Sequence, residues 1–104
     1  MTYTTIGCDV SVWQDNNSTA QQIDFAKMKS AGASFVFIKA SQGGWADQDI
    51  IYNWTNAKRA GILRGAYHFL TFDVSPIIQA EYFWSLLRSD PGELPLVIDF
   101  ENRA

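Results

Sequence analysis

Four short apolar runs recur along the chain, and their starts are spaced by roughly 30 residues, the size of a strand-plus-helix unit. The runs cover residues 6–11, 34–40, 63–70 and 96–101. They are rich in β-branched and aromatic side chains, which is typical of strands buried in a parallel sheet. We therefore predict four strands.

The segments between these runs carry helix signals. Asp24 is a suitable N-cap for a short helix that Gly32 would end, and a second helix would end at Gly61. Ser75 followed by Pro76 forms an N-cap and first-turn pair that opens a third helix. The alternation of strand and helix predicts an α/β fold with a parallel sheet and right-handed crossovers.

The length of the chain limits how this sheet can be completed. With 104 residues the chain is one domain, residues 1–104. A closed (β/α)₈ barrel needs about 200 residues or more. The sequence therefore predicts either a small open α/β sheet or half of a larger structure.

Composition excludes several classes of protein. Hydrophobic residues make up 47% and charged residues 18%, which rules out a disordered chain. The net charge of −3 and the lack of a basic run argue against a nucleic-acid partner. Cys8 is the one cysteine, so an intramolecular disulfide and a multi-cysteine metal site are excluded. No apolar run approaches the roughly 18 residues of a membrane span. We expect no metal, no cofactor and no membrane insertion.

Acidic residues stand at the ends of the first and fourth runs. Asp99 and Glu101 lie two residues apart, so they share one face of the fourth strand with Val97. Carboxylates at the end of an apolar strand are costly to desolvate, and strand carboxyl ends are where α/β proteins place their sites. The alternative is an acidic pair that ends the strand in solvent. Asp9 is a third such acid, or else the start of an Asx turn.

Five ordered segments match a known family. They are residues 7–14 (GCDVSVWQ), 35–43 (FVFIKASQG), 57–61 (AKRAG), 65–69 (GAYHF) and 94–101 (LPLVIDFE). In these segments the sequence resembles the glycoside hydrolase family 25 lysozymes, which are N-acetylmuramidases of bacteria and phages. The segments span nearly the whole chain but correspond to the first half of the family's domain.

The resemblance implies a fold, an activity and roles for four residues. The fold is a (β/α)₈-like TIM barrel, of which this chain would supply about four βα units. The activity is hydrolysis of the β-1,4 bond between N-acetylmuramic acid and N-acetylglucosamine in bacterial peptidoglycan. Glu101 resembles the general acid, and Asp99 resembles the partner that assists the 2-acetamido group or stabilises the transition state. Asp9 resembles the acid that lines the sugar site, and Tyr67 resembles its aromatic wall.

Other polar and aromatic residues are candidates for substrate binding. Lys39 stands near a strand end, where it would bind substrate or pair with an acid of the cluster. Gln42 stands where the family often has Glu; glutamine keeps the hydrogen bonding but not the charge, so an electrostatic role at that position is in doubt. Trp13 and Trp45 follow strand ends, where indoles either stack on sugars or pack within loops. His68 is expected to be a hydrogen-bonded structural residue rather than a support for the site.

The sequence leaves alternatives for function and location. A half-length relative could be a non-catalytic module for peptidoglycan binding or assembly, and an unrelated α/β regulator with an acidic pocket is the third reading. The N-terminus lacks the basic and apolar regions of a secretory signal. We therefore expect action at the bacterial cell wall, either as a phage endolysin released from the host cytoplasm through holin pores or after non-classical export.

The predicted sheet has a consequence for assembly. Four parallel strands cannot close a barrel, so both edge strands would expose unpaired backbone groups. We expect Phe35, Phe37 and Phe69 to lie bare on the open face, whereas Trp54 and Trp84 should join the core. The isolated chain is therefore predicted to self-associate, with a two-fold homodimer as the favoured form.

Overall fold

The computed structural model describes residues 23–100 in full and residues 6–10 as backbone. The predicted alternation of strands and helices is confirmed, and a short strand that was not predicted, β3, follows β2. The elements are β1 (Ile6–Val10), α1 (Phe25–Ser30), β2 (Ala33–Gln42), β3 (Trp45–Ala46), α2 (Ile50–Ala60), β4 (Leu63–Phe69), α3 (Pro76–Leu87) and β5 (Val97–Asp99).

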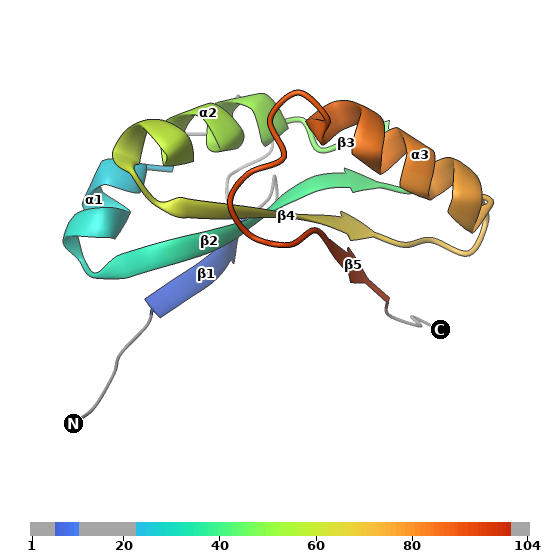
Figure 1. Cartoon of the computed structure of the whole chain (residues 1–104). Coiled ribbons are helices and arrows are strands. Elements are labelled where there is room, and N and C mark those ends of the chain that lie inside the picture. Colours follow the sequence, from blue (N-terminus) through green and yellow to red (C-terminus); the bar gives the residue numbers. More distant parts are fainter. Residues whose placement is uncertain (1–5, 11–22, 101–104) are drawn as a thin grey trace.

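The strands form one sheet in the order β1-β2-β4-β5, and these neighbours are all parallel. β3 pairs antiparallel with the end of β2. The three helices cover one face of this sheet, and no described element covers the other face (Figure 1). In residues 6–10 and 23–100, no helix is both long and apolar enough to cross a bilayer.

The helix ends follow the capping residues that the sequence indicated. The Asp24 side chain accepts a hydrogen bond from the Lys27 backbone N–H at 2.9 Å. Ser75 caps α3 in the same way, with Pro76 as its first residue. Gly61 ends α2 in the left-handed conformation at φ 79°, which glycine adopts without steric cost.

The core lies between the helices and the covered face of the sheet. Its members are the buried apolar residues Phe25, Val36, Ile38, Ala40, Trp54, Ala57, Ile62, Ala66, Phe83 and Leu87. The expectation for Trp54 is therefore confirmed, but the one for Trp84 is wrong, because Trp84 is 47% exposed. The buried residues of α3 are Gln79, Phe83 and Leu87 at a spacing of four, and Trp84 falls one residue outside that stripe.

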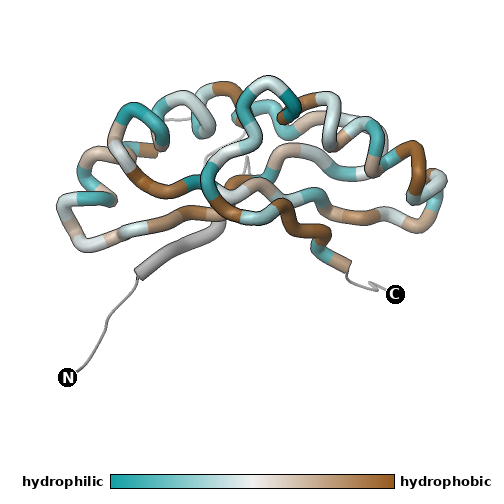
Figure 2. Tube along the Cα trace, viewed as in Figure 1, coloured by the Kyte–Doolittle hydropathy of each residue, from teal (hydrophilic) through white to brown (hydrophobic). Residues whose placement is uncertain are grey.

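The open face is less bare than expected. Phe35, Phe37 and Phe69 are only partly exposed, so the prediction that they lie bare is wrong. The rings of Phe35 and Phe37 pack edge to face with centroids 6.0 Å apart, and Gly65 leaves room for the Phe37 ring where a Cβ would collide with it. Apolar exposure is concentrated instead on α3 and on β5 with its flanking residues, and hydrophobic stretches of the chain lie there (Figure 2). The exposed residues are Ile77, Ile78, Trp84, Leu96, Val97, Ile98 and Phe100.

A buried arginine at the start of β4 forms an ion cluster that the sequence did not reveal. Arg64 is 1% exposed. Its guanidinium binds both Asp90 oxygens at 2.9 Å and both Glu93 oxygens at 2.8 and 3.1 Å. It also stacks over the Trp54 ring at 4.4 Å from the centroid. We call Arg64, Asp90 and Glu93 the Arg64 clamp.

The clamp changes the protonation of its members. Hydrogen bonds from Arg64 hold the pKa values of Asp90 and Glu93 below their ordinary values, against an opposing effect of burial. Burial alone would lower the pKa of Arg64, but its hydrogen bonds and charge interactions with the two carboxylates raise it above the usual value. All three groups therefore stay charged near neutral pH.

The lowered carboxylate pKa values predict acid sensitivity. A carboxyl group with a depressed folded-state pKa stabilises the fold above its unfolded-state pKa of about 4, and this stabilisation is lost as pH falls through the folded-state value. Because Asp90 and Glu93 are 40% and 39% exposed, solvent screening reduces the effect. In urea titrations between pH 6 and pH 3, we expect wild type to lose about 1–2 kcal/mol more unfolding free energy than Asp90→Asn/Glu93→Gln. Equal losses in the two proteins would contradict this, and Glu81→Gln, which removes an exposed acid on α3, should behave as wild type.

Candidate functional site

The carboxyl ends of β2, β4 and β5 meet at one edge of the sheet. The backbone register places Gln42, Phe69 and Asp99 side by side across the three strands, with Lys39 and Tyr67 paired further back. Val36, Ile38 and Ala66 on the same strands pack against the helices, so alternation turns these residues to the open face. The structure thus brings together four predicted site residues: Lys39, Gln42, Tyr67 and Asp99.

A β-bulge at Ala40 creates this arrangement. Lys39 pairs with Tyr67 and Ser41 pairs with His68, so β2 carries one extra residue between them. Strict alternation would place Lys39 and Gln42 on opposite faces, whereas the bulge restores Gln42 to the face of Lys39. The apolar run in the sequence gave no sign of this extra residue.

Lys39 places an ammonium group on the open face. It is 3% exposed, and its Nζ donates a hydrogen bond to Gln42 Oε1 at 2.5 Å. The same nitrogen lies 5.3 Å from the centroid of the Trp45 ring and 5.5 Å from that of Phe69. Aromatic faces attract a desolvated ammonium, so these rings stabilise the charge in a largely dry setting. Trp45 therefore lies on the same face as the candidate site, as the predicted role in sugar stacking requires.

His68 lies on the opposite face and is structural. It is fully buried, and its Nδ1 lies 2.7 Å from Ser41 Oγ and its Nε2 2.8 Å from Gln79 Oε1. Gln79 Nε2 donates to the carbonyls of Thr71 and Val74, so the atom of Gln79 that contacts His68 is the acceptor Oε1. The ring proton of a neutral His68 is therefore assigned to Nε2, which donates to this oxygen. Nδ1 then accepts from Ser41. This network fixes the loop that follows β4 at the rim of the site.

Three predicted residues are described only in part or not at all. The register places the Asp9 backbone opposite Phe37, on the edge strand furthest from Asp99, and nothing is described of the Asp9 side chain. Glu101 and Trp13 lie outside the described residues. Their roles, and the closeness of Glu101 to Asp99, stay predictions.

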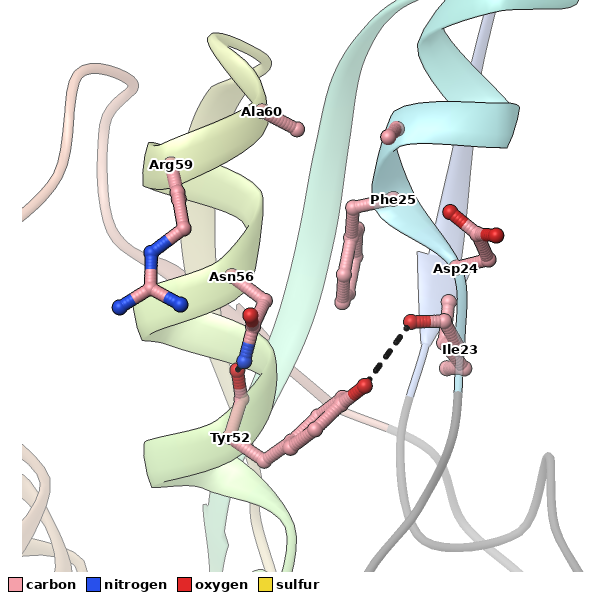
Figure 3. A pocket seen from close by; sticks show the side chains of 8 residues that line it. Ile23, Asp24, Phe25, Tyr52, Asn56, Arg59 and Ala60 are labelled. Atoms are coloured by element: carbon pink, nitrogen blue, oxygen red, sulfur yellow. Dashed lines mark hydrogen bonds between the residues drawn. The ribbon is translucent and has the colours of Figure 1, made fainter.

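A cavity elsewhere in the fold is unrelated to this site. It has a volume of about 310 Å³ and lies between α1 and α2 on the helix side of the sheet. Phe25 and Tyr52 form its walls, and the Tyr52 hydroxyl donates to the Ile23 carbonyl (Figure 3). Asp24 and Arg59 are the charged residues among those that line it (Figure 3). The part of the chain that the structure describes also holds no cluster of three or more metal-binding His, Cys, Asp or Glu residues.

Comparison with known proteins assigns the family. The family model for glycosyl hydrolases family 25 matches residues 8–104. The chain belongs to this family. It is 42% identical over 104 residues to Lysozyme M1 of Streptomyces globisporus, an alignment that covers 92% of this chain and 32% of the lysozyme.

Solved structures of family 25 members agree with the fold. The chain superposes on a family 25 glycosyl hydrolase from Bacillus anthracis with a TM-score of 0.85 at 36% identity, covering 98% of this chain and 45% of that one. It also superposes on the CTP1L endolysin with a TM-score of 0.72 at 27% identity, covering 92% of this chain and 34% of that one. The predicted family and α/β fold are thus confirmed, and the chain spans 32–45% of the length of these relatives.

The hydrogen bonds of Gln79 predict a large effect on the unfolding free energy that does not depend on substrate. Gln79→Leu keeps the side-chain volume but removes hydrogen bonds to His68, Thr71 and Val74. Buried polar groups left unpaired cost about 1–3 kcal/mol each, so we expect the unfolding free energy to fall by about 3 kcal/mol in urea titrations. The control Gln48→Leu changes an exposed glutamine and should stay within about 0.5 kcal/mol of wild type. A loss of that small size in Gln79→Leu would contradict the network's role.

Proposed function

We propose that the chain carries the acidic, N-terminal half of a muramidase active site. The substrate is bacterial peptidoglycan, and the reaction is hydrolysis of the β-1,4 bond between N-acetylmuramic acid and N-acetylglucosamine. The observation that supports this most is the placement of Asp99 beside Phe69 and Gln42 at the carboxyl edge of the sheet, in a chain that belongs to family 25. Strand carboxyl ends carry the catalytic residues of (β/α)₈ enzymes.

The chemistry requires one protonated and one ionised carboxyl group. A glycosidic oxygen leaves readily only when an acid protonates it, and we assign that step to Glu101. Neighbouring carboxylates would help Glu101 to keep its proton near neutral pH. Asp99 would remain ionised, where it orients the 2-acetamido group of the sugar or balances the positive charge of the transition state. Asp9 would line the same groove.

The remaining residues of the open face supply binding surface. Tyr67 and Phe69 provide ring faces, and Trp45 is 46% exposed beside Lys39. Sugars present apolar faces that stack on such rings, whereas the Lys39 ammonium adds positive potential on a face that otherwise carries acids. We assign Lys39, Gln42, Tyr67 and Trp13 to substrate binding, with Trp45 as an added stacking surface.

The acid role of Glu101 has a direct test. Glu101→Gln keeps the shape of the side chain but cannot protonate the leaving oxygen, so peptidoglycan lysis should fall by about 10²–10⁴. The assay measures loss of turbidity of a peptidoglycan suspension, with the chain or with a longer polypeptide that contains it, and circular dichroism checks the fold. Glu81→Gln makes the same change on α3 and should leave lysis intact. Near-normal lysis by Glu101→Gln would refute the assignment.

A second candidate function is a non-catalytic peptidoglycan-binding or assembly module. The neutral Gln42 is the observation behind it, whereas the similarity to family 25 lysozymes supports hydrolysis. A chain that sediments with peptidoglycan but releases no reducing sugar, and whose binding survives Glu101→Gln, would support this alternative over hydrolysis.

The biological setting is a narrower proposal. The structural similarity to the CTP1L endolysin supports a phage lysis protein that acts on the cell wall. Such a protein would accumulate in the host cytoplasm and reach the wall through holin pores or by non-classical export. No nucleic-acid partner and no cofactor is part of this proposal.

We further propose that the isolated 104-residue chain forms a homodimer through its β5 edge. Leu96, Val97, Ile98 and Phe100 are all exposed there, and strand edges with apolar side chains promote pairing. Light scattering should report a dimer of the 11.7 kDa chain, since closed two-fold symmetry is the common outcome for identical subunits.

A matched pair of variants locates the interface. Ile98 on β5 and Leu63 at the start of β4 are both 48% exposed. Ile98→Lys should give a monomer, whereas Leu63→Lys should leave the dimer intact. A monodisperse wild-type monomer, or equal effects of the two variants, would contradict a dimer through β5.

A further inference from the structure

The register of β5 is weakly determined by the strand itself. β5 has three residues, of which Val97 is 37% exposed and Ile98 is 48% exposed. Burial of one face normally fixes strand register, and a slip by one residue moves every side chain to the opposite face. Such a slip would turn Asp99 from the open face to the helix face. Some other interaction must therefore hold β5 in place.

The Arg64 clamp holds the segment directly before β5. The backbone N–H groups of Glu93 and Leu94 both donate to the Arg64 carbonyl at 2.9 Å. In return, the Glu93 carboxylate accepts from the Arg64 backbone N–H at 2.9 Å and from its guanidinium. Gly92, at φ 83°, lies so close to Trp54 and the Arg64 carbonyl that a Cβ would collide with both. Main chain and side chain of Arg64 thus bind the same short segment.

The clamp lies two residues before β5. The Glu93 and Leu94 N–H groups both bind the Arg64 carbonyl, and only residues 95 and 96 separate Leu94 from Val97, the first residue of β5. The clamp therefore limits how far β5 can move along β4. From the clamp to Asp99 the distance is about 16 Å, at about 3.3 Å per strand residue.

We propose that Arg64, through Asp90 and Glu93, is a positioning residue that sets the register of β5 and so fixes which face of the sheet Asp99 presents. For catalysis this inference rests on the proposed muramidase function. The register itself does not depend on that function and can be measured without substrate.

Hydrogen exchange at two backbone N–H groups tests the register. The Leu70 N–H donates to the Asp99 carbonyl on the β5 side of β4, and the Gly43 N–H donates to the Phe69 carbonyl on the β2 side. In the 104-residue chain, Glu93→Gln and Arg64→Lys should speed exchange at Leu70 by about tenfold or more, with less than about threefold change at Gly43. Glu81→Gln should change neither site.

The outcomes separate positioning from general support. Equal acceleration at Leu70 and Gly43 would mean that the clamp stabilises the whole fold, and no acceleration at Leu70 would mean that β5 keeps its register without the clamp. Either result overturns the proposal. If Arg64→Lys does not fold, the milder Glu93→Gln decides.

A kinetic comparison then tests the consequence for the reaction. At a temperature where the variant is folded, Glu93→Gln should lower kcat for peptidoglycan hydrolysis by about tenfold with KM within about twofold, because misplaced carboxylates affect the transition state more than binding. An unchanged kcat would overturn the positioning role. Absence of hydrolysis in wild type would refute the proposed function while leaving the exchange result to stand on its own.

Discussion

A buried guanidinium organises the second half of the described fold. Arg64 satisfies its donors with Asp90 and Glu93 and stacks on Trp54, so one side chain joins β4, α2 and the loop after α3. A charge this well buried is tolerated only when it is paired, and removing both carboxylates would leave an uncompensated ion. Because Asp90 and Glu93 are both bound to Arg64, the loop after α3 has little conformational freedom. The loop in turn carries β5 to the edge of the sheet where Asp99 lies.

The two faces of the sheet have different roles: one packs against the helices and the other carries the candidate site. Apolar packing and the His68–Gln79 network occupy the helix face, where Gln79 pairs with the backbone of Thr71 and Val74. The open face holds the cation, the rings and the carboxylate of the candidate site. Because adjacent residues on a strand point to opposite faces, Lys39 and Tyr67 are each flanked by buried neighbours that anchor them from behind. Lys39 between Ile38 and Ala40 is the clearest case.

Local patterns in the sequence predicted much of this arrangement. Capping residues and short apolar runs indicated the helices and the parallel strands, and alternation along residues 96–101 placed Asp99 on the face of Val97, as the register shows. The Ala40 bulge could not be predicted from the sequence. The run of residues 34–40 is mostly apolar on both faces, so it has no clear alternation that an extra residue would interrupt. The Arg64 clamp was missed for another reason: its partners lie 26 and 29 residues away, and neither local spacing nor composition links them. Trp84 faces outward because the buried stripe of α3 consists of Gln79, Phe83 and Leu87. Hydrophobicity alone would not have placed a glutamine in that stripe.

The bulge at Ala40 also means that β2 carries one residue more than its pairing with β4 requires. A deletion there would leave the apolar character of the strand intact and would look conservative in any alignment of hydropathy. Deletion of Ala40 would remove the bulge and restore simple alternation beyond Lys39, so Ser41 and Gln42 would keep their present faces. The full-length strand without a bulge would instead turn the Gln42 amide toward the helices, away from the Lys39 ammonium that it now binds. At this point of the fold, tolerance to insertion and deletion is set by an odd-or-even count of residues rather than by their chemistry.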